Sequence, residues 1–218
     1  MIVATLALIV LFQEPAAWAK FEPGSWAEHL TTGKRDGAAV RTVEKSHYKD
    51  ATPTEVIISL ETVEAGGGSS VVDMKYPIPQ REVPKEDPGK KTGDEKLTLD
   101  GRDFACEILE KRGVRRWVCA AATVNGGVLK SEAISGPIQI LVRVLKLDDK
   151  IKVGKDTLSC WVREEITDTG DQKTTRTTWM SDEVPGGVVR SDVRQVRGKD
   201  VLVETTTTLT GFSAVKKK

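Results

Sequence analysis

An internal repeat limits the fold of this chain more than any other feature of the sequence. Trp117 is followed at residues 126–132 by Gly-Gly-Val, an aliphatic residue, a basic residue, Ser and an acid, and Trp179 is followed by the same pattern at residues 186–192. Glycine pairs and Asn-Gly in this setting mark tight turns between strands. The repeat therefore predicts two similar sets of strands joined by hairpins.

Each copy of the repeat starts with a strand-like segment that leads to a cysteine, Cys106 in the first copy and Cys160 in the second. The copies extend over about residues 97–133 and 151–193. The cysteine lies 11 residues before the tryptophan in the first copy and 19 before it in the second. We expect the eight additional residues to form a longer hairpin around residues 168–171, four on each arm. Four is a multiple of the strand period, so both tryptophans should lie on the same face.

Strand patterns occur throughout the chain, whereas no segment combines a helical apolar period with capping signals. We expect an all-β fold, a large curved antiparallel sheet or half-barrel to which the repeat contributes about two thirds of the strands. The expected strands are residues 37–48, 54–64, 69–76, 96–110, 114–124, 127–135, 138–147, 151–167, 172–181, 187–197 and 201–210.

The N-terminus has the pattern of a secretory signal peptide. Residues 2–12 are apolar but too short to span a bilayer, and Ala-Trp-Ala at residues 17–19 is typical of a cleavage site. We expect cleavage after Ala19 and no stable membrane insertion of the released chain. The alternative is that the apolar run is the first strand of the domain.

The remainder is expected to be one β domain over residues 20–215, followed by a basic tail at 216–218. A Pro-rich loop at 77–94 interrupts it, because proline at this density cannot join a ladder. An exported chain of this design is periplasmic or extracellular.

Three cysteines in an exported protein predict one disulfide and one unpaired thiol. If a hairpin turns on Arg112 and Gly113, Cys106 lies directly opposite Cys119 at a non-hydrogen-bonded site, where Cα atoms come closest. This geometry favours a Cys106–Cys119 disulfide. The alternative joins Cys106 to Cys160, the equivalent positions of the two copies.

The sequence contains no recognisable catalytic or cofactor motif. It has two histidines, and none of the His, Cys or Asp spacings of a zinc or calcium site. The triple glycine at residues 66–68 lacks the Gly-Lys-Ser/Thr that completes a phosphate loop. A formal net charge of +1 gives no field that favours nucleic acid. We therefore expect a protein that is not an enzyme, with no catalytic residues, metal or cofactor.

Trp117 and Trp179 are the candidate ligand-binding residues. As core residues they would anchor the sheet packing, and on an open concave face they would bind an apolar ligand. The order of strand, cysteine, tryptophan and Val-Pro-Gly turn resembles a group of exported bacterial β-proteins without an assigned activity. More distantly, residues 95–212 resemble the curved sheets of lipoprotein carriers and related lipid-binding periplasmic proteins.

That resemblance implies a half-barrel and a non-catalytic binding module, with a lipid or other apolar ligand on the concave sheet face. The alternative is a structural or protein-interaction component of the cell envelope, whose partner would be an envelope protein.

Overall fold

The computed structural model describes residues 15–52, 54–77 and 89–216. The apolar run at residues 2–12 and most of the predicted Pro-rich loop lie outside these ranges. The elements, in chain order, are α1 Pro15–Trp18, β1 Trp26–Arg35, β2 Ala38–Ala51, β3 Glu55–Glu64, β4 Ser69–Pro77, β5 Lys90–Leu99, β6 Arg102–Lys111, β7 Val114–Val118, a 3₁₀ turn Asn125–Gly127, β8 Val128–Ser135, β9 Ile138–Val153, β10 Asp156–Asp168, β11 Lys173–Met180, β12 Val188–Arg197 and β13 Asp200–Ser213.

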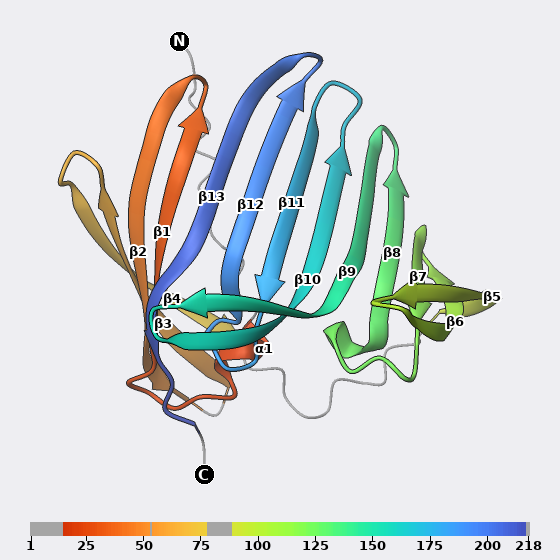
Figure 1. Cartoon of the computed structure of the whole chain (residues 1–218), viewed down its shortest axis with the longest axis horizontal. Coiled ribbons are helices and arrows are strands. Elements are labelled where there is room, and N and C mark those ends of the chain that lie inside the picture. Colours follow the sequence, from red (N-terminus) through yellow and green to blue (C-terminus); the bar gives the residue numbers. More distant parts are fainter. Residues whose placement is uncertain (1–14, 53, 78–88, 217–218) are drawn as a thin grey trace.

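The 13 strands of the described residues form one antiparallel sheet, in the order β4-β3-β2-β1-β13-β12-β11-β10-β9-β8-β7-β6-β5. The sheet is curved and does not close, and β4 and β5 are its two edges (Figure 1). This confirms the predicted fold class. β1, the fourth strand from the β4 edge, pairs with β13, so the N-terminal and C-terminal strands of the described chain lie side by side in the sheet.

Strand β5 corrects the boundary of the predicted loop. It begins at Lys90, inside the segment 77–94 that the prolines assigned to a loop, and it pairs with β6 from its first residue. The last proline of that segment is Pro88, and the following residues, Lys90 to Lys96, are charged or small. Their polarity resembles that of a loop, but they form a solvent-exposed edge strand.

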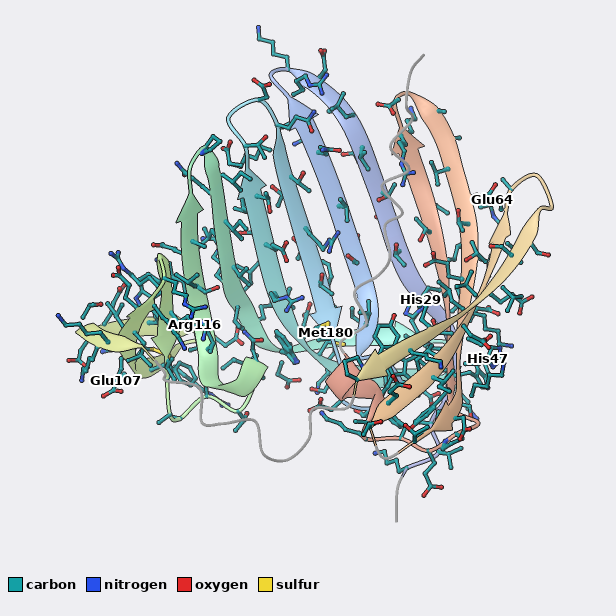
Figure 2. The ribbon with its side chains drawn as sticks, turned by 180° about the vertical axis from the view of Figure 1, so that it is seen from behind. His29, His47, Glu64, Glu107, Arg116 and Met180 are labelled. Atoms are coloured by element: carbon teal, nitrogen blue, oxygen red, sulfur yellow. A yellow bond between two sulfur atoms is a disulfide. The ribbon has the colours of Figure 1, made fainter. Side chains whose placement is uncertain are left out.

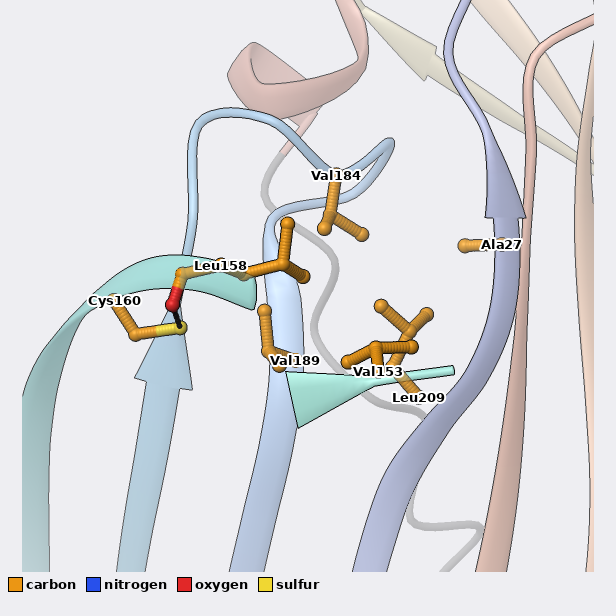
Figure 3. Close-up of a cluster of buried hydrophobic side chains, with 7 residues drawn as sticks. All are labelled: Ala27, Val153, Leu158, Cys160, Val184, Val189 and Leu209. Carbon is orange, nitrogen blue, oxygen red and sulfur yellow. Dashed lines mark hydrogen bonds between the residues drawn. The ribbon is translucent and has the colours of Figure 1, made fainter. Parts of the chain in front are cut away.

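The core is divided among three clusters of buried side chains. Two of them form where a hairpin tip folds across the sheet. In Figure 3 the end of the β9–β10 hairpin places Val153 and Leu158 against Val184, Val189 and Leu209. The end of the β5–β6 hairpin does the same in the first copy, and the Asp100 carboxylate in its turn accepts a hydrogen bond from the backbone N–H of Leu147 on β9.

The third cluster involves the segment in which cleavage is predicted. The side chain of Trp18, in α1, is 0 % exposed and packs edge-on against Tyr48, with ring centroids 6.1 Å apart. Phe21, Val56 and Ile58 complete the cluster. A chain that starts at Lys20 would lack Trp18 and leave a cavity at this end of the sheet.

We therefore expect a chain that begins at Lys20 to be less stable than one that retains residues 14–19, by about 3–5 kcal/mol, the usual cost of deleting a buried Trp side chain. Chemical denaturation of the two purified chains measures the difference. Trp18→Ala in the longer chain should reproduce the loss. Equal stabilities would show that the folded domain does not need Trp18, which is what cleavage after Ala19 requires.

Candidate functional site

The two tryptophans of the repeat lie in equivalent surroundings. In the first copy the Trp117 indole N–H donates to Glu95 Oε2 at 2.6 Å, and Lys130 Nζ lies 4.1 Å from the ring centroid. Lys130 in turn pairs with Glu132 at 2.8 Å. Trp117 is directly opposite Lys130 in the β7–β8 register.

The second copy repeats this arrangement with different side chains. The Trp179 indole N–H donates to Asp149 Oδ2 at 2.8 Å, and the Arg190 guanidinium lies 4.9 Å from the ring centroid. Arg190 pairs with Asp192 at 2.8 Å and is directly opposite Trp179. The indole hydrogen bond is the main reason why the pKa of Asp149 is lowered. The tryptophans therefore lie on the same kind of surface, as the hairpin spacing predicted.

The burial and the bonding partners of Trp117 and Trp179 favour a structural role for them over the predicted ligand-binding role. Trp117 is 3 % exposed and belongs to a buried cluster with Phe104 and Leu129, and Trp179 is half-buried and packs against its own cluster. Each N–H already has an acceptor, and a cation lies over each ring. This geometry favours an anchoring role, and the ligand role stays a prediction.

The disulfide joins Cys106 to Cys119, as the hairpin register predicted. The β6–β7 pairs run from Glu107 opposite Val118 to Lys111 opposite Val114, so the next pair outward is the two cysteines. Their Cα atoms are 4.1 Å apart, and both side chains are buried.

Cys160, the equivalent of Cys106, is an unpaired thiol in the second copy. The β10–β11 register places Trp161 opposite Met180, so Cys160 is opposite Ser181. Ser181 therefore occupies the position of Cys119. Burial raises the pKa of the Cys160 thiol to about 11, so this thiol is not a reactive thiolate at neutral pH.

Hollows on the described surface are lined by both charged and apolar groups. One of about 600 Å³ faces β5 and β6, with Ala105 and Cys106 as its apolar lining and Asp94, Glu95, Lys96, Asp103 and Glu107 as its charged lining. Most of its exposed lining is apolar in spite of these charges.

Two findings concern membranes and metals. Within residues 15–52, 54–77 and 89–216, no group of three or more His, Cys, Asp and Glu side chains is placed to hold a metal ion. No helix of these residues is long and apolar enough to cross a membrane.

His29 is a buried titratable group on β1, beside β13 (Figure 2). It is 1 % exposed, its Nε2 lies 2.9 Å from the Val188 carbonyl oxygen, and its Nδ1 has no partner among the described atoms. Burial lowers its pKa, against smaller raising effects of the Val188 carbonyl and Glu28. Glu44, directly opposite on β2, has a raised pKa because it too is desolvated.

We expect the stability to fall as the pH drops below about 6.5. The unfolded chain then binds a proton that folded His29 resists, with a slope of at most about 1.4 kcal/mol per pH unit. His29→Gln should flatten this fall in melts between pH 7.5 and 5, roughly the range over which histidine titrates. Glu44 acts in the opposite direction, because its raised pKa stabilises the folded chain as it protonates. Glu44→Gln should therefore steepen the acid loss, and a slope unchanged by His29→Gln would assign the loss to other groups.

The two edge strands of the sheet differ in how they are protected from pairing with another chain. Five of the ten residues of β5 are charged, an irregularity follows Lys91, and Lys91 and Lys96 form ion pairs across to Glu107 and Asp103. Charges and bulges are the features with which natural edge strands avoid unwanted pairing.

Strand β4 has less of this protection. It pairs with β3 in an unbroken register from Ser69 to Pro77, and two of its nine residues are charged. Val71 is 64 % and Val72 55 % exposed, the largest exposures of the large apolar side chains described. The sequence predicted the strand but not its place at the edge, because order within a sheet is a long-range property. The signal in the sequence that could have indicated an edge strand was the pair of adjacent valines, Val71 and Val72, in the strand that leads into the predicted loop.

Comparisons with known proteins give distant structural similarities. No family model and no curated protein matches the chain. It is similar to a crystal structure of a Bacteroides fragilis protein inferred to be exported and described as having a YmcC-like fold, with a TM-score of 0.40, 11 % identity and coverage of 88 % of this chain and 98 % of that chain. It is also similar to an inferred lipoprotein of Parabacteroides distasonis, with a TM-score of 0.43, 12 % identity and coverage of 89 % and 96 %. At these scores neither similarity bears on what this chain does.

Proposed function

We propose that this chain is an exported, non-catalytic interaction protein that binds an extended strand of a partner along the edge of β4 that no described strand occupies. The observation that carries the proposal is the exposed valine pair on β4, an edge strand of nine residues with an unbroken register and fewer charges than β5. An added strand forms main-chain hydrogen bonds with such an edge, and side chains on alternate positions supply specificity. This is the protein-interaction alternative of the two functions that the sequence left open.

The surroundings of the tryptophans support this choice over a carrier of an apolar ligand. The rings are covered by Lys130 and Arg190. A lipid carrier needs a contiguous apolar surface. The valines of β4 offer apolar side chains next to open main-chain hydrogen-bonding groups, which suits a peptide strand.

The proposal can be tested with a photo-reactive amino acid at Ser70, on β4, and a matched control at Thr92, on the protected edge β5. In exporting cells we expect adducts from the Ser70 position and none from Thr92. Proline at Val71 or at Val72 then tests whether the main chain is used. In an antiparallel strand neighbouring residues direct their N–H groups to opposite sides.

One of these two prolines therefore blocks the free edge and leaves the β3–β4 ladder intact. That variant should retain its melting temperature and lose the adduct. Adducts that persist in both proline variants, or that form equally at Thr92, would contradict strand addition at β4.

A further inference from the structure

Resting on the proposed function of β4, we propose that the partner is a second copy of this chain, and that the two β4 strands pair antiparallel with Asp73 of each subunit opposite Lys75 of the partner subunit. The pair would form about a two-fold axis and join two sheets into one. The proposal rests on the edge position of β4, the exposure of its side chains and the order of its charges.

Symmetry restricts the registers that two identical β4 strands can adopt. Residues directly opposite each other in a ladder project to the same face, and residues on one strand share a face when they are two apart. In a two-fold pair, the residue numbers of two directly opposite residues always add to the same sum, and that sum identifies the register. The sum must therefore be even. Registers with odd sums would place side chains on opposite faces and are excluded.

Charge decides among the remaining registers. A sum of 146 places Asp73 opposite its own copy, and a sum of 150 places Lys75 opposite its own copy, so each brings like charges together at the two-fold axis. A sum of 148 places Asp73 opposite Lys75 twice. Opposite charges across a ladder stabilise the pair and like charges destabilise it. A sum of 144 pairs neither charge with the other.

The other contacts of the 148 register fit the exposures seen in the single chain. Met74 meets its own copy at the axis, and the exposed Val72 lies opposite the half-buried Tyr76. Aromatic and β-branched residues are favourable cross-strand pairs. Asp73 already accepts an ion pair from Lys49 at 2.6 Å, and Lys49 and Ser59 lower its pKa, so the carboxylate is charged when a second cation approaches.

Single cysteine variants test the register directly. Met74→Cys should cross-link to its own copy under mild oxidation, because only residues near the axis meet their own copies. Val72→Cys reports the 144 register and Asp73→Cys the 146 register. The native thiols should not interfere, because Cys106 and Cys119 are joined and Cys160 is buried. Efficient cross-linking at Val72 or Asp73 with none at Met74 would overturn the proposed register.

Charge reversal tests the two ion pairs. Asp73→Lys and Lys75→Asp should each weaken the dimer roughly tenfold, because two attractive contacts become two repulsive ones. The double variant exchanges the charges and should restore the dimer, whereas a loss of fold would not be restored. Sedimentation equilibrium over a concentration series measures the dissociation constant, and melting temperatures of the same samples report folding.

The outcomes separate this inference from the proposed function. A chain that stays monomeric, but still forms edge-dependent adducts with another protein at Ser70, would overturn the self-association and retain strand addition. A chain that neither dimerises nor forms adducts would overturn both. A dimer that survives both single charge reversals would overturn the ion pairs as its basis.

Discussion

Trp117→Ala should lower the free energy of unfolding by about 3–5 kcal/mol, the range for deleting a buried tryptophan side chain. Trp117 is 3 % exposed and packs against the disulfide and Leu129, so the deletion leaves a cavity that the cross-linked hairpin cannot close easily. Urea denaturation followed by circular dichroism measures the loss. Trp179→Ala should cost less, because that ring is half-buried.

A matched variant separates packing from hydrogen bonding. Trp117→Phe keeps most of the ring volume but leaves Glu95 without the indole donor, so its loss should lie between wild type and Trp117→Ala. Near-neutral results for Trp117→Ala and Trp179→Ala together would show that neither ring anchors the core. That outcome would favour the ligand-binding role predicted from the sequence.

Ser181→Cys should create a second disulfide with Cys160 and stabilise the chain by about 3 kcal/mol, as expected for closing a loop of this length. The register places the two residues opposite each other, as Cys106 and Cys119 are in the first copy. Both are buried, at 1 % and 3 % exposure, so no rearrangement of the surface is needed. Thiol labelling of unfolded protein followed by mass spectrometry counts the remaining thiols.

The control for this prediction carries Ser181→Cys together with Cys160→Ser, which exchanges the thiol and the hydroxyl. It should show no gain that depends on oxidation. A free thiol at both positions in oxidised Ser181→Cys protein would mean that the second hairpin is not equivalent to the first at this pair.

The properties that sequence predicted correctly are local ones. The turn at Arg112 and Gly113 fixes the pairing of every residue in the β6–β7 hairpin, and both residues adopt the positive φ that such a turn requires. The disulfide follows from that register. Trp117 and Trp179 lie on equivalent faces because the longer hairpin of the second copy adds four residues to each arm. Four is an even number, so the alternation of side chains along the strand is unchanged.

Two local turns, at residues 100–101 and 154–155, were not predicted from the sequence, and they lie inside the expected strands 96–110 and 151–167. The other properties that were missed depend on contacts between distant segments. Strand β1 was not among the expected strands, because Trp26–Arg35 is mostly polar and its alternation is weak. It forms because β13 and β2 pair with it on both sides. Glu95 and Asp149, the acids that accept the indole hydrogen bonds, were also missed. They are 54 positions apart, the same spacing as Cys106 and Cys160, so the repeat could have indicated that they are equivalent.

The strand order of the sheet differs from the order along the chain at one place. Strands β5 to β13 follow one another across the sheet, and β1 to β4 come after β13. Every neighbouring pair except β1–β13 is formed by consecutive strands, so the β1–β4 part and the β5–β13 part of the sheet can each assemble from hairpins alone. Among the described strand pairs, the β1–β13 seam, with the bridge from Phe21 to Lys216, is the one that needs both ends of the chain. During vectorial synthesis or passage through a membrane pore, β1 would therefore emerge first and stay unpaired on one side until the last strand arrives. The polar sequence of β1 lowers the risk of aggregation while its edge is unpaired, because an unpaired apolar strand would be the first site of aggregation.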